Sequence, residues 1–168
     1  MRPEEVSFCP KCGTRTLMQL RFGQERPVCP ACGFIYFADP KVAVAVMLER
    51  DARILLVRRA NEPFRGLWTF PAGFVNAGED PALAAARECL EETGLVIAIS
   101  AILEIRAGRE HPRGSDFVIF YHAQLQGGTL LAGDDADAAD WFERGNLPPL
   151  AFQSTKAILE RFYTVPHK

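Results

Sequence analysis

Residues 73–95 read GFVNAGEDPALAAARECLEETGL, a stretch that puts one arginine and four glutamates in, or just before, a single predicted helix. Asp80 can cap the first turn of that helix, and Pro81 suits its first position, where no backbone N–H donor is needed. Gly94 can adopt the left-handed conformation that ends a helix. These residues predict a helix over 81–93.

The helical spacing separates two sets of side chains. At about 100° per residue, one face carries Glu88, Glu91 and Glu92 and the nearly opposite face carries Leu83, Ala86 and Leu90. The three like charges repel, so their convergence favours hard cations with oxygen ligands among them, most naturally Mg²⁺ or Mn²⁺. The alternative is a solvated acidic face, which most glutamate-rich helices carry.

Neighbouring residues fit the metal hypothesis. Arg87 lies at the edge of the acidic face, where it can pair with Glu79 or Glu91 and orient the carboxylates. Ala84 and Ala85 lie one turn earlier near the same face and are small enough to leave room for a phosphate chain above the metals.

The spacing of this stretch resembles the Nudix box. Gly73 is followed after five residues by Glu79 and after seven more by the run RECLEETGL at 87–95. Seven such fixed residues would coincide by chance at about one start position in 10⁸. Cys89 stands where the family usually carries an aliphatic side chain, and a buried free cysteine behaves as a small hydrophobe.

Two CxxC turns, Cys9-Pro-Lys-Cys12 and Cys29-Pro-Ala-Cys32, define a separate unit over residues 1–38. Four thiolates on two tight turns predict a closed, structural Zn²⁺ site of the zinc-ribbon kind. The alternative is a pair of disulfides. A unit this small buries too little apolar surface to fold alone, so we expect the metal to stabilise it.

Composition narrows the partners of the chain. The 168 residues carry a net charge of −2, which argues against nucleic acid held by bulk charge. The ribbon therefore predicts a structural or dimer-building role in preference to a nucleic-acid-binding finger, and a homodimer is a possible assembly. The first ten residues contain no apolar signal region, and the longest apolar run, 42–48, is too short to cross a bilayer. We expect a cytoplasmic protein.

The remaining residues, 39–168, predict one α/β domain. Strand-like runs predict strands at 41–50, 53–59, 68–70, 96–107, 115–124 and 140–144, and a last helix is expected at 152–163. Residues 125–139 are rich in glycine and aspartate and predict a loop. This order is similar to the Nudix fold, an α/β/α sandwich around a mixed sheet.

The resemblance implies further site residues. In the family a backbone carbonyl at the first box glycine helps to hold metal, which here means Ala72 or Gly73. Family members also recruit a later acidic residue to bind metal or activate water, for which the candidates are Asp134, Asp135 and Asp137.

Substrate contacts are expected outside the box. Phe64 and Trp68 can stack on a purine or an isoalloxazine ring, although packing beside the sheet is the simpler interpretation of Trp68. Arg109, His111 and Arg113 could contact a pyrophosphate or ribose, and the alternative for them is solvated loop charge.

Two zinc-ribbon branches of the Nudix hydrolases are similar to this chain. NADH pyrophosphatases carry a downstream SQPWPFP array, which is absent here. The plant plastid FAD and ADP-ribose pyrophosphatases and their bacterial relatives share the segments ADPKVAV, GLWTFPAGF and a sequence like PPLAFQS, all of which occur here. The second branch is the more similar.

By that resemblance, the chain hydrolyses the pyrophosphate of an adenine dinucleotide such as ADP-ribose or FAD to AMP and the other phosphorylated half. Glu88, Glu91 and Glu92 would hold Mg²⁺ or Mn²⁺, and Glu91 or Glu92 could also act as the base. Glu79 and Arg87 would support them. The alternatives are an NADH pyrophosphatase or NAD-cap-removing enzyme, and a non-catalytic ligand sensor with a DNA-binding ribbon.

Overall fold

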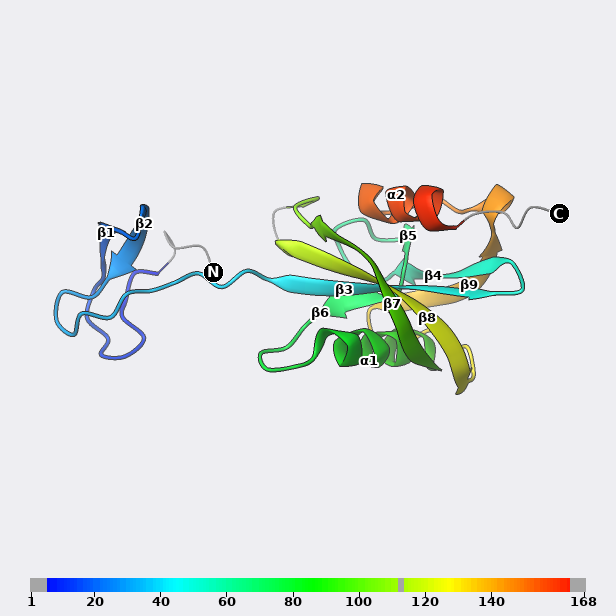
Figure 1. Cartoon of the computed structure of the whole chain (residues 1–168), viewed down its shortest axis with the longest axis horizontal. Coiled ribbons are helices and arrows are strands. Elements are labelled where there is room, and N and C mark those ends of the chain that lie inside the picture. The colour runs from blue at the N-terminus through cyan, green and yellow to red at the C-terminus, as the bar shows by residue number, and fades with distance from the viewer. Residues whose placement is uncertain (1–5, 112–113, 164–168) are drawn as a thin grey trace. The chain divides into compact units, whose positions relative to one another are not determined.

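The computed structural model describes residues 6–111 and 114–163 (Figure 1). The chain divides into two compact units, Met1–Pro40 and Lys41–Lys168. The break therefore falls two residues beyond the boundary expected from the sequence. In the described part of the chain, no helix is long and apolar enough to span a membrane.

The first unit is built on a hairpin of β1 (Leu17–Arg21) and β2 (Gln24–Val28), which pair antiparallel. Its turn needs positive φ, which Gly23 adopts at 75°. Among the described residues of this unit, the buried hydrophobic side chains are Val6, Cys9, Val28 and Cys29. So small a core cannot stabilise the unit by the hydrophobic effect alone.

The second unit contains one mixed sheet. Its strands are β3 (Val42–Arg50), β4 (Arg53–Arg59), β5 (Trp68–Thr69), β6 (Ala72–Phe74), β7 (Leu95–Ala107), β8 (Phe117–Gly128) and β9 (Ala136–Glu143). The main path runs β5-β4-β3-β8-β7, while β6 pairs with β3 and β9 pairs with β4. β3 and β8 are parallel and the other pairs are antiparallel.

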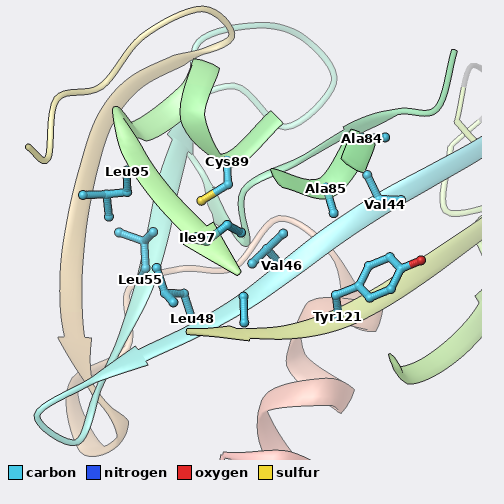
Figure 2. Close-up of a cluster of buried hydrophobic side chains, with 11 residues drawn as sticks. Val44, Val46, Leu48, Leu55, Ala84, Ala85, Cys89, Leu95, Ile97 and Tyr121 are labelled. Carbon is cyan, nitrogen blue, oxygen red and sulfur yellow. The ribbon is translucent and has the colours of Figure 1, made fainter. Parts of the chain in front are cut away.

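One helix covers each face of this sheet, as Figure 1 shows, so the predicted α/β/α sandwich is confirmed. These helices are α1 (Pro81–Thr93) and α2 (Gln153–Phe162). The period-2 alternation of β3 explains the two layers. Val44 and Val46 point into the cluster under α1 (Figure 2), whereas Ala45 and Met47 point into the cluster under α2.

The predicted bounds and caps of α1 are confirmed. Asp80 Oδ1 accepts hydrogen bonds from the backbone N–H groups of Ala82 at 2.8 Å and Leu83 at 3.3 Å. At the other end, Gly94 has φ 67° and donates its N–H to the carbonyl of Leu90 at 2.8 Å. The helix is therefore closed at both ends by local hydrogen bonds.

The expected role of the small residues in α1 is wrong. Ala84 and Ala85 are 0% exposed and pack in the core under the helix, so they do not border an open phosphate site (Figure 2). Leu83 and Leu90 are 68% and 48% exposed. The small alanines allow the helix backbone to approach the sheet, and this turns the leucine face outward.

The expected loop at 125–139 is shorter than the sequence indicates. β8 continues to Gly128 because Gly127 and Gly128 pair with Val96 and Leu95 of β7. β9 begins at Ala136, since its alanine-rich first half pairs with the end of β4. Partner strands supply hydrogen bonds that the glycines and alanines alone do not signal.

Candidate active site

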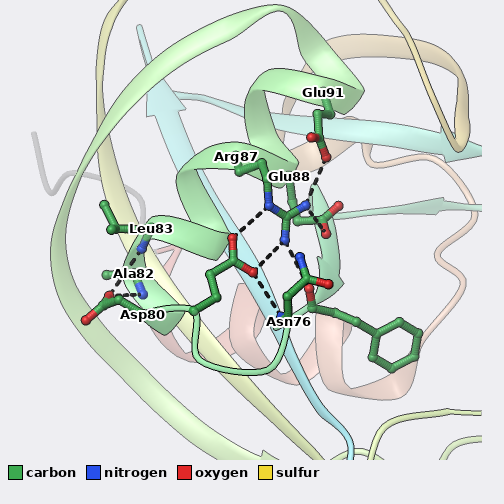
Figure 3. A network of polar contacts seen from close by, with 9 residues as sticks. Asn76, Asp80, Ala82, Leu83, Arg87, Glu88 and Glu91 are labelled. Atoms are coloured by element: carbon green, nitrogen blue, oxygen red, sulfur yellow. Dashed lines mark hydrogen bonds and ion pairs between the residues drawn. The ribbon is translucent and has the colours of Figure 1, made fainter.

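Arg87 is the centre of a network of polar contacts on α1 (Figure 3). Its Nε and Nη2 donate to the two carboxylate oxygens of Glu79 at 2.8 and 2.9 Å. Its Nη1 donates to Glu88 at 2.7 Å and Glu91 at 3.0 Å, and Nη2 also reaches the carbonyl of Phe74 at 3.1 Å. One guanidinium thus orients three carboxylates and ties them to β6.

The pairing with Arg87 changes the acidity of Glu79. Hydrogen bonds from Arg87, supported by the backbone N–H of Asn76 at 2.9 Å, lower the pKa of Glu79 to about 2. Glu79 therefore stays ionised at any ordinary pH. It serves as a fixed negative partner that holds Arg87 in place.

Glu92 lies in a different environment, because it is 5% exposed. Its Oε2 accepts a hydrogen bond from the backbone N–H of Ala72 at 2.9 Å. Burial raises the pKa of Glu92 to about 8, and the negative charges of Glu88, Asp135 and Asp134 act in the same direction. A buried carboxylate with these neighbours favours either a proton or a bound cation.

Glu88 packs directly on the glycine of β6. A Cβ added to Gly73 would lie 1.9 Å from Cδ of Glu88, so any side chain at this position would displace the carboxylate. Burial also raises the pKa of Glu88, against the opposing effect of Arg87. The backbone at Ala72–Gly73 and the carboxylates of Glu88 and Glu92 are thus neighbours.

The three box glutamates do not converge on one point as the helical spacing suggested. In the described residues, the four cysteines are the one group of three or more ligating side chains whose ligand atoms all lie within 4.8 Å of one another. Glu88 and Glu91 instead share Nη1 of Arg87, while Glu92 turns to the backbone of Ala72. Helical spacing predicts on which face of the helix each glutamate lies, but it does not predict that Arg87 and the backbone of Ala72 bind these carboxylates.

The three later aspartates separate into two groups. Asp134 and Asp135 act electrostatically on Glu92, and Asn61 Nδ2 donates to Asp135 Oδ1 at 2.7 Å. Asp137 instead forms an ion pair with Arg58 at 2.7 Å. The structure therefore brings Asp134 and Asp135, but not Asp137, toward the box glutamates.

A pocket of about 360 Å³ opens beside the Ala72–Gly73 backbone. Its lining includes Ala45 and Phe120 of the central strands, Arg59 at the end of β4, His111 of the β7–β8 turn and Phe152 at the start of α2. A channel of this size beside buried carboxylates can receive part of a nucleotide.

The two aromatic residues predicted to contact substrate lie in different surroundings, Phe64 beside the pocket and Trp68 in the core. Phe64 packs edge-on against Phe152, with ring centroids 5.3 Å apart, and so supports a ring that lines the pocket. Trp68 packs edge-on against Phe142 at 4.7 Å and joins the core under α2. The simpler interpretation of Trp68, packing beside the sheet, agrees with this geometry.

The charged turn between β7 and β8 is only partly described. Arg109 is exposed and forms an ion pair with Asp116 at 3.3 Å, and Arg113 lies outside the described residues. His111 lines the pocket and stacks against Phe152, with ring centroids 6.2 Å apart.

Several pocket residues carried no sequence signal. Asn61 and Glu110 lie in connections without periodicity or motif spacing, whereas Arg59 ends β4 and Phe152 precedes α2, where the patterns predicted a strand and a helix but no pocket. One sequence feature could have drawn attention to Phe152, because it occupies the N-cap position, where a small polar residue is usual.

The four predicted zinc-ribbon cysteines come together in the first unit. Their sulfur atoms lie within 4.8 Å of one another, with Sγ–Sγ distances of 3.4 to 3.6 Å for three of the pairs. These distances exclude S–S bonds, so the disulfide alternative is wrong for this structure. Hydrogen bonding by Thr14 lowers the pKa of Cys12 to about 6, which favours the thiolate that metals bind.

Comparison with known sequences gives relatives of at least three kinds, among them an ADP-ribose pyrophosphatase and a NAD-capped RNA hydrolase. An ADP-ribose pyrophosphatase of Methanocaldococcus jannaschii is 42% identical over 123 residues, 73% of this chain and 73% of the relative. A NAD-capped RNA hydrolase, NudC, of Pseudomonas aeruginosa is 31% identical over 151 residues, which cover 89% of this chain. The match covers only 52% of NudC, so the chain spans about half the length of that relative.

Comparison with solved structures gives the same fold. The crystal structure of a NUDIX hydrolase from Nitrosomonas europaea superposes with a TM-score of 0.81 at 31% identity, covering 94% of this chain and 90% of that one. The sequence model of the NUDIX domain matches residues 39–162. With the box geometry, the sandwich fold and these matches together, the chain belongs to the NUDIX domain family.

Proposed function

We propose that this protein is a divalent-metal-dependent pyrophosphatase that cleaves an adenine dinucleotide of the ADP-ribose or FAD kind into AMP and the other phosphorylated half. The observation that carries the proposal is the buried Glu92 beside Glu88 and the Ala72–Gly73 backbone, at the edge of a pocket of about 360 Å³. The M. jannaschii ADP-ribose pyrophosphatase, 42% identical, supports this class of substrate.

The donor set fits Mg²⁺ or Mn²⁺. Carboxylate and backbone carbonyl oxygens are the ligands that these hard cations prefer, and Nudix enzymes generally need divalent metals. Gly73 forms a cradle for the Glu88 carboxylate that any Cβ would fill. Glu92 is buried among negative charges, which a cation would offset. We propose Glu88, Glu91, Glu92 and the carbonyl of Ala72 or Gly73 as ligands.

The side chains would then act in distinct ways. A bound cation would supply positive charge to the pyrophosphate oxygens and lower the pKa of the attacking water. Arg87, held by Glu79, keeps Glu88 and Glu91 in position. Glu92, Asp134 and Asp135 are the candidates for the base that accepts a proton from water, a role open to a carboxylate oxygen that the cation does not occupy.

We propose that the four cysteines hold a structural Zn²⁺. A tetrahedral site with Zn–S bonds of about 2.3 Å requires sulfur atoms about 3.8 Å apart. Three of the cysteine pairs have Sγ–Sγ distances of 3.4 to 3.6 Å, close to that value. A site filled by four protein ligands leaves no position for substrate, so its role would be to stabilise the first unit.

The second candidate function is hydrolysis of NADH or of NAD-capped RNA. The match to P. aeruginosa NudC favours it, because 89% of this chain is more than the hydrolase unit, Lys41–Lys168, contains. The similarity therefore extends into the cysteine-bearing unit. ADP-ribose, FAD and NADH share an adenosine diphosphate half, so one site could accept each of them.

The test is product release from ADP-ribose, FAD, NADH and NAD-capped RNA at matched concentrations, first with Mg²⁺ and then with Mn²⁺. We expect AMP from ADP-ribose or FAD at the highest kcat/KM. Preference for NADH or capped RNA would select the second candidate. If none of the four is cleaved, the pyrophosphatase proposal is wrong and a ligand sensor becomes the better description.

Two variants link any activity to this site. Glu92→Gln should lower kcat by roughly 10²–10⁴-fold, because the amide supplies neither the charge nor the proton acceptor. Glu143→Gln changes an exposed glutamate whose ion-pair partner, Arg53, lies outside the pocket, so it should retain wild-type kcat. Equal activity of the two variants would disprove the assignment.

A further inference from the structure

The turn between β7 and β8 is attached to the start of α2 by one carboxylate, that of Glu110. Its Oε2 accepts the backbone N–H of Gln153 at 2.6 Å, and its Oε1 accepts the backbone N–H of Ser154 at 2.9 Å. In Figure 1 the end of β7 and the N-terminal end of α2 lie side by side. Gln153 and Ser154 follow Glu110 by 43 and 44 residues in the chain.

This attachment replaces a cap that α2 does not supply itself. Phe152 occupies the N-cap position and has no side-chain acceptor, and the first turn of α2 contains no acidic residue. The first backbone N–H groups of a helix need acceptors, and a carboxylate is favoured there by the helix dipole. Glu110 satisfies two of these groups from outside the helix.

The residues next to this contact line the proposed substrate pocket. His111 follows Glu110, and Phe152 immediately precedes the two amides that Glu110 binds. The two rings stack, with centroids 6.2 Å apart and planes inclined by 30°. Phe64 packs edge-on against both, and Arg59 lies over the Phe152 ring at 5.3 Å.

We propose that Glu110 is a positioning residue for substrate binding: by capping α2 from the β7–β8 turn, it holds His111 against Phe152 and so shapes one wall of the nucleotide pocket. The inference rests on the proposed function, because it takes this pocket as the place where the nucleotide binds. Glu110 does not act on the reacting phosphorus.

The expected consequence is a change in binding without a change in chemistry. Removing the carboxylate releases the turn from α2, although the turn keeps its own backbone hydrogen bonds, so only a fraction of molecules would have the wall in place. If that fraction falls to one tenth, KM rises about tenfold, because apparent affinity scales with the competent population. The box glutamates are untouched, so kcat should stay within about twofold.

The experiment compares wild type with Glu110→Ala, Glu110→Gln and a matched control, Glu104→Gln. Glu104 also anchors α2, through an ion pair with Arg161 at 3.0 Å, but it does not line the pocket. We expect KM for the best substrate to rise about tenfold in Glu110→Ala. The KM of Glu110→Gln should lie between those of wild type and Glu110→Ala, since its amide oxygen still accepts one backbone N–H. The KM of Glu104→Gln should equal that of wild type.

A second readout reports on position in the substrate-free protein. The ring protons of His111 should be shifted in the NMR spectrum by the neighbouring Phe152 and Phe64 rings, and a His111→Gln spectrum assigns them. We expect Glu110→Ala to remove that shift and Glu104→Gln to retain it. A residue that touched substrate directly would change KM and leave these signals unchanged, which would overturn the positioning role.

The other outcomes are also decisive. Unchanged KM in Glu110→Ala, or equal losses of kcat in Glu110→Ala and Glu104→Gln, would overturn the inference while the proposed function stands. If wild type cleaves none of the dinucleotides, the proposed function fails, and calorimetry with AMP then tests the role of Glu110. Weaker binding of AMP to Glu110→Ala than to wild type supports the positioning role. Equal binding by the two proteins, or no binding by either, overturns it.

Discussion

At the scale of single residues, burial separates glutamates that look alike in the sequence. Glu79 and Glu92 belong to the same box, yet the pKa of Glu79 is lowered to about 2 by Arg87 and the pKa of Glu92 is raised to about 8 by burial. The first is a permanent anion and the second can exchange a proton or bind a cation near neutral pH. The assignment of each to its role stays a prediction.

The raised pKa of Glu92 predicts how stability depends on pH without added Mg²⁺ or Mn²⁺. A glutamate in an unfolded chain titrates near about 4.3, so between that pH and about 8 the folded state holds the extra proton. The free energy of unfolding of wild type should therefore fall as pH rises from 5 to 8, by roughly 1–3 kcal/mol. Glu92→Gln should be less sensitive to pH.

Urea unfolding at pH 5, 6.5 and 8 measures this dependence. Both tryptophans of the chain, Trp68 and Trp141, lie in the second unit, so their fluorescence reports its unfolding. Glu143→Gln serves as the exposed control. If wild type and Glu92→Gln show the same dependence on pH, the burial of Glu92 does not govern it.

Gly73→Ala tests the contact between β6 and Glu88. The new Cβ would lie within about 2 Å of the carboxylate, so Glu88 must move, and a misplacement of 1 Å can lower a rate about 10²-fold. Gly73 is not among the glycines with positive φ, so the backbone itself accepts alanine. We expect a large loss of kcat, a higher Mg²⁺ requirement and a stability loss of only about 1 kcal/mol.

The control for this change is Gly145→Ala, whose Cβ would meet nothing within 4 Å. It should keep wild-type kcat and stability. Full activity of Gly73→Ala would mean that the position of the Glu88 carboxylate is not needed for turnover.

At the scale of elements, the N-terminal ends of the two helices are capped in different ways. α1 is capped by its own Asp80, three residues or fewer from the amides it serves. α2 is capped by Glu110, from a turn more than forty residues earlier. The start of α1 can therefore be predicted from local sequence, whereas the cap of α2 forms only in the packed fold.

Asp80→Ala should lower the free energy of unfolding by about 1 kcal/mol, because two backbone N–H groups of the first turn of α1 lose their acceptor. The proposed metal ligands Glu88, Glu91 and Glu92 lie two turns or more further along α1, so kcat should change little. Tryptophan fluorescence during urea unfolding measures the difference. Asp80→Ser restores an acceptor and should recover most of the stability; if it is as destabilised as Asp80→Ala, the cap is not the cause.

At the scale of the whole molecule, the chain joins a well-cored hydrolase unit to a small unit whose described residues include few buried hydrophobic side chains. The second unit has hydrophobic clusters on both faces of its sheet. In the first, the described buried hydrophobic residues include two of its four cysteines, Cys9 and Cys29. We therefore expect the two units to differ in what stabilises them, hydrophobic burial in one and metal binding in the other.

Cys29→Ser should remove bound zinc and unfold the first unit, while the second unit keeps its tryptophan fluorescence and its turnover. Zinc content per chain and the amide NMR signals of residues 6–40 measure the loss. Cys89→Ala removes a buried cysteine of the second unit and should leave the zinc content unchanged. Full zinc retention in Cys29→Ser would show that the four sulfurs are not the binding site.

The residue spacing by itself determined the features that depend on local contacts. Asp80, Pro81 and Gly94 set the bounds of α1, apolar runs indicated β3 and β4, and the CxxC pairs indicated the cysteine cluster. The caps of α1 and each CxxC turn arise from interactions within a few residues, so the order of residues is enough to indicate them, and the repeated CxxC indicates that its two copies meet although they lie 17 or more residues apart.

Tertiary structure alone decided which of these features face inward and what they meet. It buried Ala84 and Ala85, set Glu92 against Ala72, paired Asp137 with Arg58 and brought Glu110 to α2. The partners in most of these contacts are far apart in the chain, and which of several polar groups wins a partner depends on burial and packing. Those quantities exist only once the sheet, its two helices and their connections have come together.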